Sequence, residues 1–167
     1  MLRETSVGVA VGDGMRLSCA SRAGRMAPLI APDSREFPMA QNDSPFFIPD
    51  ADPESISSDV AGFGGLLVST QIPTLEDGSL ELGDIKAQSE ATLRSLKVAL
   101  EKAGSGLDHV LHLTIYLTSM ADRAAFNEVY CSFFGKPYPV RAAVGISELA
   151  VEGMKVEVTA IAAKRAG

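Results

Sequence analysis

The spacing of apolar residues after Asp59 alternates between the period of strands and the period of helices, and this alternation constrains the fold more than any other feature. The apolar run Leu66–Ile72 is stopped by Pro73 and a Glu-Asp-Gly turn, which predicts a strand. Ser57–Ala61 is expected to pair with it as a hairpin across the glycines between them. Two strands therefore begin the patterned part of the chain.

Two helices are predicted further along. Asp84 is a suitable cap for a helix that runs to about Ala103 with one apolar face, and Gly104 follows as its stop. A second helix is predicted over roughly Ala121–Phe134, before Gly135 and an extended proline-rich segment.

Three more segments alternate with the period of a strand: Val110–Thr118, Val140–Ser147 and Lys155–Ala163. The predicted element order is β-β-α-β-α-β-β, which is an α+β domain with two helices on one face of a mixed sheet. We expect the opposite face to carry residues such as Ala143, Gly145, Thr159 and Ile161 rather than a row of charges. Because such a face needs a cover, the sequence predicts a homo-oligomer.

Charge and composition exclude several classes of protein. Residues 40–167 hold 17 acidic and 10 basic side chains, and no basic stripe is present, so nucleic-acid binding is not expected. No apolar run approaches the roughly 20 residues that span a bilayer, so no membrane association is expected. The two cysteines and the lack of a secretory signal pattern favour the cytoplasm. Residues 1–45 show no sustained period and are interpreted as a loosely structured extension before a domain over 46–167.

Arg141 and Glu157 are the charged residues that the strand assignments place inside the last two strands, at positions expected to share one face. A structural salt bridge is one interpretation. The alternative is an anion site, in which the planar guanidinium of Arg141 binds a small organic acid and Glu157 accepts a hydrogen bond from water or an amine.

Other residues carry weaker signals. His109 and His112 have no neighbouring ligand that completes a zinc set, and the glycines around Phe63 precede a strand rather than a helix, so neither a metal nor a cofactor is predicted. Asn127 in the second helix is interpreted as a brace for a neighbouring loop, with substrate contact as the alternative.

Several stretches, taken in order, resemble the reactive-intermediate deaminase family, which is also called Rid or YjgF-like and, in older usage, endoribonuclease L-PSP. The resemblance covers about 53–163 and is carried by Leu67–Pro73, Gln88, Phe126–Tyr130, Pro139–Arg141 and Val156–Ala162. It implies a chorismate-mutase-like fold and a homotrimer with ligand clefts between subunits. The implied reaction is hydrolysis of enamine and imine carboxylic acids to keto acids and ammonia, without a cofactor.

The resemblance also implies roles for single residues. Arg141 corresponds to the arginine that grips the substrate carboxylate, the backbone of Ala143 lines the pocket beside it, and Glu157 positions the attacking water. Two positions depart from the family pattern: Thr70 replaces the glycine of a Ser-Gly-Gln stretch, and Ile56 stands where a pocket tyrosine is usual. These departures leave a trimeric ligand-binding or regulatory protein as the alternative, and a ribonuclease is less favoured because the core is acidic.

Overall fold

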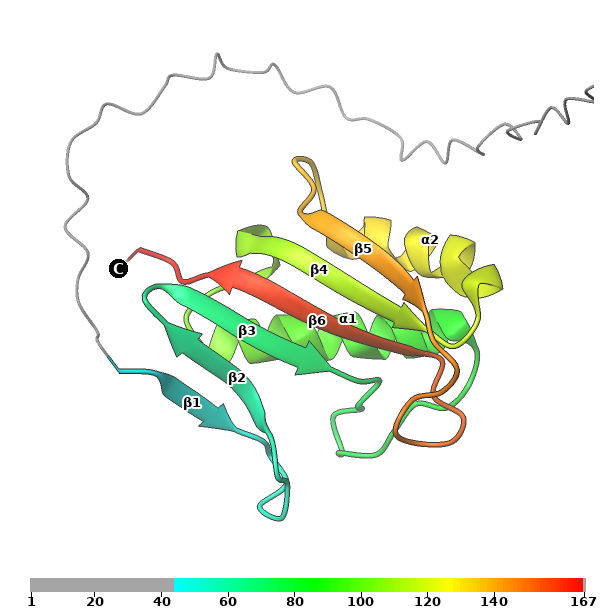
Figure 1. The fold of residues 1–167 in the computed structure, drawn as a ribbon, viewed down its shortest axis with the longest axis horizontal. Coiled ribbons are helices and arrows are strands. Elements are labelled where there is room, and N and C mark those ends of the chain that lie inside the picture. The colour runs from blue at the N-terminus through cyan, green and yellow to red at the C-terminus, as the bar shows by residue number, and fades with distance from the viewer. Residues whose placement is uncertain (1–43, 167) are drawn as a thin grey trace, which may run out of the picture. The chain divides into compact units, whose positions relative to one another are not determined.

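The computed structural model of the chain describes residues 44–166. They form one six-stranded sheet and two α-helices (Figure 1). The elements are β1 (Phe46–Pro49), β2 (Ser58–Phe63), β3 (Leu66–Gln71), α1 (Ile85–Lys102), β4 (Val110–Leu117), α2 (Arg123–Phe133), β5 (Val140–Gly145) and β6 (Val156–Ala163). The loosely structured extension predicted over residues 1–45 lies, apart from its last two residues, outside the described part.

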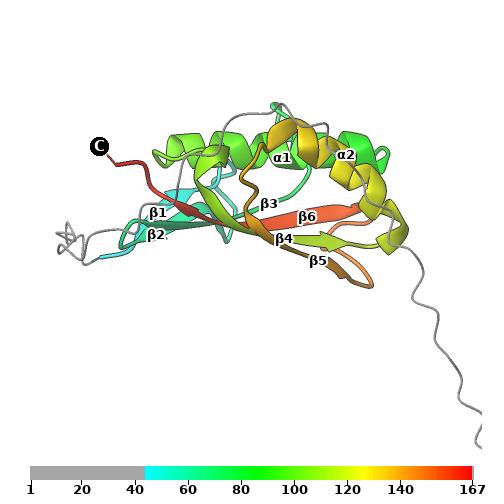
Figure 2. The ribbon, with the colours of Figure 1, turned by 90° about the horizontal axis from the view of Figure 1, so that it is seen from above.

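The strand order across the sheet is β1-β2-β3-β6-β4-β5. All neighbours are antiparallel except β4 and β5, which are parallel. Both helices lie on the same face of the sheet (Figure 2). The predicted α+β class, with two helices on one face of a mixed sheet, is therefore confirmed.

Strand β1 was not predicted, so the observed order has one strand more at its beginning. It is only four residues long and ends at a proline, so the alternation of apolar and polar residues is too short to be recognised in the sequence. Its partner is β2, where Gly62 lies opposite Phe46. A Cβ at Gly62 would come within 2.4 Å of the Phe46 ring, so glycine is required for this ring to cover the strand.

Helix α1 begins and ends where the sequence predicts. Asp84 Oδ1 accepts a hydrogen bond of 2.9 Å from the Ala87 backbone N–H, which satisfies a donor at the helix N-terminus. Gly104 follows the helix with a φ of 77°, in the left-handed region that glycine adopts without strain. These two residues fix the length of the helix that covers the sheet.

Replacing Asp84 with alanine is expected to lower the free energy of unfolding by about 1 kcal/mol, the usual cost of losing an N-cap. Urea unfolding followed by circular dichroism measures this change. Glu101→Ala, at an exposed position near the other end of α1, is the control and should change stability by less than about 0.5 kcal/mol. Equal effects of the two variants would contradict the capping role.

The hydrophobic core lies between the helices and the sheet. The sheet contributes alternate residues of its central strands, such as Leu67, Leu113 and Val158, each with no exposed surface. The helices contribute buried residues from one face each, including Leu96 and Phe126. Because every second strand residue points to the opposite face, the core alone leaves half of the sheet uncovered.

Gln88 is a fully buried polar residue of α1 that connects the helix to the loop before β6. Its Nε2 donates to the Gly153 carbonyl at 2.9 Å and to the Gly83 carbonyl at 3.2 Å. Its Oε1 accepts from the Lys155 backbone N–H at 2.7 Å. One side chain thus satisfies three backbone groups from two separate segments.

Gln88→Leu is expected to reduce the free energy of unfolding by about 3 kcal/mol, because leucine fills the space but leaves buried backbone groups without partners. Thermal unfolding should show a loss of roughly 10 °C. Lys97→Leu, on the exposed side of the same helix, is the matched control and should shift the melting temperature only slightly. A Gln88→Leu protein as stable as this control would contradict the account.

The face of the sheet opposite the helices is largely apolar and partly exposed. One row across it joins residues of successive strands by direct pairing: Phe47, Ala61, Val68, Ile161, His112 and Val140. Phe47 and Val140 are 62% and 71% exposed. The prediction of an uncovered, charge-poor face holds for Thr159 and Ile161. Ala143 and Gly145 belong to the helix side, since they pair with the core residues Ile115 and Leu117.

Candidate functional site

Arg141 lies on the edge strand β5 and points to the helix side of the sheet. The parallel register places Arg141 opposite Leu113, a core residue, and Ala143 opposite Ile115. The Arg141 Nη1 donates a hydrogen bond of 2.8 Å to Asn127 Oδ1 on α2. Its guanidinium carbon also lies 4.6 Å from the centroid of the Tyr130 ring. The side chain is thus held at the open edge of the sheet by two residues of one helix.

Glu157 lies on the opposite face, and the prediction that it shares a face with Arg141 is wrong. The register places Glu157 beside Tyr116, three residues along β4 from the partner of Arg141. Because an odd number of residues separates these β4 positions, their neighbours on β5 and β6 point to opposite sides of the sheet. A salt bridge between Arg141 and Glu157 within one subunit is therefore excluded.

The contacts of Arg141 leave most of its hydrogen-bonding capacity available. A guanidinium has five N–H donors, and Asn127 takes one of them. The residue is exposed, on an edge strand, so a ligand can reach the remaining donors. A carboxylate is the natural partner, since its two oxygens match two parallel donors of a guanidinium.

Asn127 and Tyr130 of α2 form the support of Arg141. Asn127 was predicted to brace a loop or contact substrate, and the structure shows it bracing the Arg141 side chain. Tyr130 was not predicted as a site residue, because its position among the apolar residues of α2 is typical of a residue packed in the core. The separation of three residues on a helix, which places side chains on one face, is the signal that links it to Asn127.

Tyr130 is 3% exposed, and burial raises the pKa of its hydroxyl while the nearby Arg141 acts in the opposite direction. Since the ordinary pKa of tyrosine is about 10, the phenol is neutral near neutral pH with or without this change. Its ring stacks on Phe134, with centroids 4.5 Å apart.

Glu157 is a half-buried carboxyl on the uncovered face of the sheet. Burial raises the pKa of its carboxyl above the ordinary value, since the charged form loses hydration there. A carboxylate with a raised pKa accepts protons more readily at neutral pH, which is the property required of a general base.

Thr70 lies on the same face as Glu157. Its hydroxyl is 2.9 Å from the Thr159 hydroxyl on the neighbouring strand, and Thr159 is two residues beyond Glu157 on β6. The structure therefore places two of the predicted site residues, Thr70 and Glu157, close together on one face. Arg141, Ala143 and Asn127 lie together on the helix side of the sheet, at its β5 edge.

Ile56 is in neither group. It lies in the loop between β1 and β2, and its side chain is fully exposed. No contact within the described part of the chain connects it to Arg141 or Glu157.

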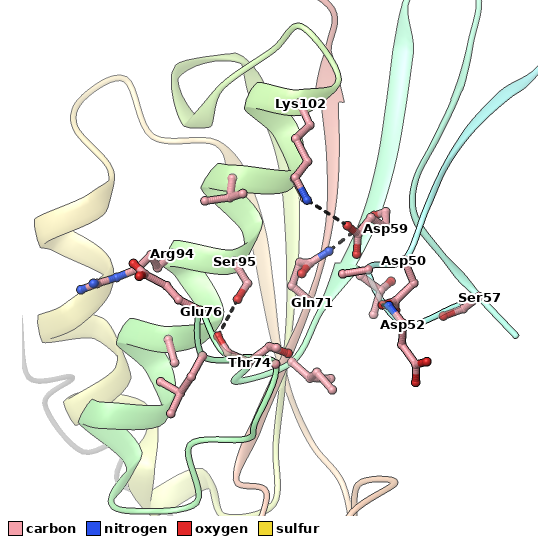
Figure 3. Close-up of a pocket in the computed structure, with 18 of the residues that line it drawn as sticks. Asp50, Asp52, Ser57, Asp59, Gln71, Thr74, Glu76, Arg94, Ser95 and Lys102 are labelled. Carbon is pink, nitrogen blue, oxygen red and sulfur yellow. Dashed lines mark hydrogen bonds and ion pairs between the residues drawn. The ribbon is translucent and has the colours of Figure 1, made fainter. Parts of the chain in front are cut away.

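A groove of about 1710 Å³ lies at the β1–β3 end of the sheet order, whereas Arg141 lies on β5 at the other end. It runs between α1, the β1–β2 hairpin and the loop after β3 (Figure 3). Seven acidic residues line it and only two basic ones, Arg94 and Lys102. Lys102 already lies 3.7 Å from an oxygen of Asp59. Such a groove repels a carboxylate, so we place the candidate site at Arg141 instead.

Within residues 44–166, no three histidine, cysteine or acidic side chains gather in a way that would hold a metal ion. No helix in the same part of the chain is long and apolar enough to cross a membrane.

Comparison with known proteins identifies the family. Residues 57–164 match the family model described as endoribonuclease L-PSP. A RutC family protein of Pyrococcus abyssi is 40% identical over 100 residues, which are 59% of this chain and 78% of the relative. The solved structure of RidA from the Antarctic bacterium Psychrobacter has a TM-score of 0.62 and 31% identity, and the match covers 75% of this chain and 98% of RidA.

The chain therefore belongs to the Rid/YjgF family, the endoribonuclease L-PSP family of older usage. The names of its relatives are varied: AldR of Lactococcus lactis, which is 34% identical over 59% of this chain and 79% of its own length, is named as a regulator.

Proposed function

We propose that this protein hydrolyses imine and enamine carboxylic acids to keto acids and ammonia. The observation that carries the proposal is the held Arg141, whose guanidinium is braced by Asn127 and retains free donors at an open edge of the sheet. This arrangement suits a small carboxylate, and the family resemblance assigns the same task to this arginine.

The proposal requires a second subunit. Arg141 and Glu157 lie on opposite faces of one sheet, so a single chain does not bring them to one substrate. The exposed apolar row through Val68, Ile161 and Val140 supports the association of sheet faces in a homotrimer. In such a trimer Arg141 of one subunit and Glu157 of its neighbour complete a cleft between them.

We expect sedimentation velocity to show a trimer at micromolar concentrations. A protein that sediments only as a monomer would contradict the composite site.

The chemistry follows from these two groups. Arg141 binds the substrate carboxylate and holds the imine carbon at a fixed position. The Glu157 carboxylate accepts a proton from a water molecule as its oxygen bonds to that carbon. As this bond forms, the electron pair of the C=N bond moves to nitrogen, which takes up a proton from solvent to give the carbinolamine; an enamine first tautomerises to the imine. The nitrogen then receives the proton held by Glu157, the hydroxyl releases its proton to solvent as the C–N bond breaks, and ammonia and the keto acid are formed. Water supplies the keto oxygen of the product, and the reaction needs no oxidant or cofactor.

Ammonia release from imines generated by an amino-acid oxidase tests the activity. The oxidase converts alanine or leucine to its imine, and the imine is followed with and without the purified protein. Faster loss of imine supports the deaminase. A rate equal to that of the uncatalysed reaction for both small and large substrates would contradict it.

A ligand-binding or regulatory role is the second candidate, and Thr70 is the observation that favours it. Its bonded hydroxyl adds bulk beside Glu157, where the family pattern has glycine. The relative named as a regulator is consistent with such a role. Binding of a keto acid without any turnover would support this candidate over the deaminase.

A further inference from the structure

The Tyr130 ring contacts the face of the Arg141 guanidinium. The separation of 4.6 Å between the guanidinium carbon and the ring centroid lies within the range of a cation–π interaction, about 6 Å. The ring therefore attracts the cation electrostatically and also fixes the plane in which its donors lie. Asn127 contributes a different constraint, since its hydrogen bond fixes only one nitrogen.

The ring is itself held firmly. Phe134 stacks on it with an interplanar angle of 18°, and the Phe126 and Tyr138 rings lie 6.3 and 6.0 Å from it. A side chain that is almost fully buried and stacked in this way has little freedom to rotate. It is a rigid surface for the guanidinium beside it.

The Tyr130 hydroxyl does not participate in this contact. Its oxygen is buried and has no hydrogen-bond partner among the described residues. A phenylalanine at this position would keep the ring and remove only that hydroxyl, which makes Tyr130→Phe a sharp control.

Arg141 needs such a support. An exposed arginine on an edge strand samples many rotamers, and it loses this freedom when it binds a carboxylate with two hydrogen bonds. A guanidinium that is already held in the correct plane loses less of this rotamer freedom on binding. The benefit appears in the affinity for the carboxylate, not in the proton transfer at Glu157.

We propose that Tyr130 is a positioning residue of the carboxylate site, whose ring orients the Arg141 guanidinium so that two donors face the ligand. This inference rests on the proposed function, because it assumes that Arg141 binds a carboxylate. It adds a specific cause for the affinity, which is the electron-rich face of one buried ring.

Substitutions at Tyr130 separate the ring from the hydroxyl. Tyr130→Leu is expected to raise KM for leucine imine, and the dissociation constant for its keto acid α-ketoisocaproate, by about two- to fivefold, with kcat changed by less than about twofold. Tyr130→Phe, which keeps the ring, should retain the wild-type KM and dissociation constant. A Tyr130→Phe protein as impaired as Tyr130→Leu would overturn the role of the ring.

Fluorinated phenylalanines at position 130 provide a test that hardly changes the packing. Successive fluorine atoms withdraw electron density from the ring face, so the affinity for α-ketoisocaproate should fall step by step. The same series at Phe134, which stacks on Tyr130 but has no contact with the guanidinium among those described, is the matched control. Equal slopes at the two positions, or no slope at 130, would overturn the inference.

The affinity series also separates this inference from the proposed function. A wild-type protein that binds α-ketoisocaproate but hydrolyses no imine contradicts the deaminase, while the series at position 130 still decides the role of Tyr130. A wild-type protein that does not bind the keto acid overturns both.

Discussion

Arg141→Ala is expected to lower kcat/KM for imine hydrolysis by about a hundredfold. Each hydrogen bond to a charged group is worth roughly 1.5–3 kcal/mol, and two of them are lost together with the charge. The lower end of this range for two bonds, about 3 kcal/mol, corresponds to a factor of about a hundred. Ammonia release at low substrate concentration measures the change.

Folding should be almost unaffected in this variant, because Arg141 is exposed and its loss leaves no buried cavity. Arg94→Ala is the matched control, since it removes another exposed arginine, which pairs with Glu90 on the same helix. Arg141→Lys keeps the charge but not the planar donors, and should recover only part of the activity. An Arg141→Ala protein with the activity of Arg94→Ala would contradict the carboxylate site.

Glu157→Gln is expected to reduce kcat by about a hundredfold or more, which is the usual contribution of a positioned base. Glutamine retains the shape and hydrogen bonding of the side chain but does not accept the proton of the attacking water. The affinity for α-ketoisocaproate should stay within about twofold of the wild type, because Arg141 still binds the carboxylate. An equal loss of turnover and affinity would contradict the role of Glu157 on the water.

The dependence of the rate on pH provides a further check on Glu157. The active form is the carboxylate, and burial raises the pKa of this group, so the wild-type rate should increase with pH through that raised value. In Glu157→Gln this increase should disappear. Glu152→Gln, in the exposed loop before β6, is the control and should retain it.

The helices and the central strands could be predicted because each has a strong local signal. Asp84 caps α1 and Gly104 ends it, so local residues indicate both boundaries of the helix. Strands β4 and β6 alternate between the core and the other face of the sheet, and this alternation is visible in the sequence. Short β1 carries no comparable signal.

The face of the sheet to which Arg141 points could not be predicted from the sequence. Every residue of β5 is exposed, and small residues occupy both of its faces, so hydrophobic alternation does not distinguish them. Only the parallel register with β4, which places Arg141 opposite Leu113, determines the side. The support from Asn127 and Tyr130 depends on the packing of α2 beside β5, which is a long-range contact and not a local pattern.

The opposite placement of Arg141 and Glu157 also makes the central claim testable by mixing two inactive proteins. Subunits that carry Arg141→Ala and subunits that carry Glu157→Gln would be unfolded together and refolded as mixed trimers. If each cleft takes Arg141 from one subunit and Glu157 from the next, about a quarter of the clefts regain both groups, and about a quarter of the wild-type rate should return. Mixed trimers that stay as inactive as either variant alone would contradict a site shared between subunits.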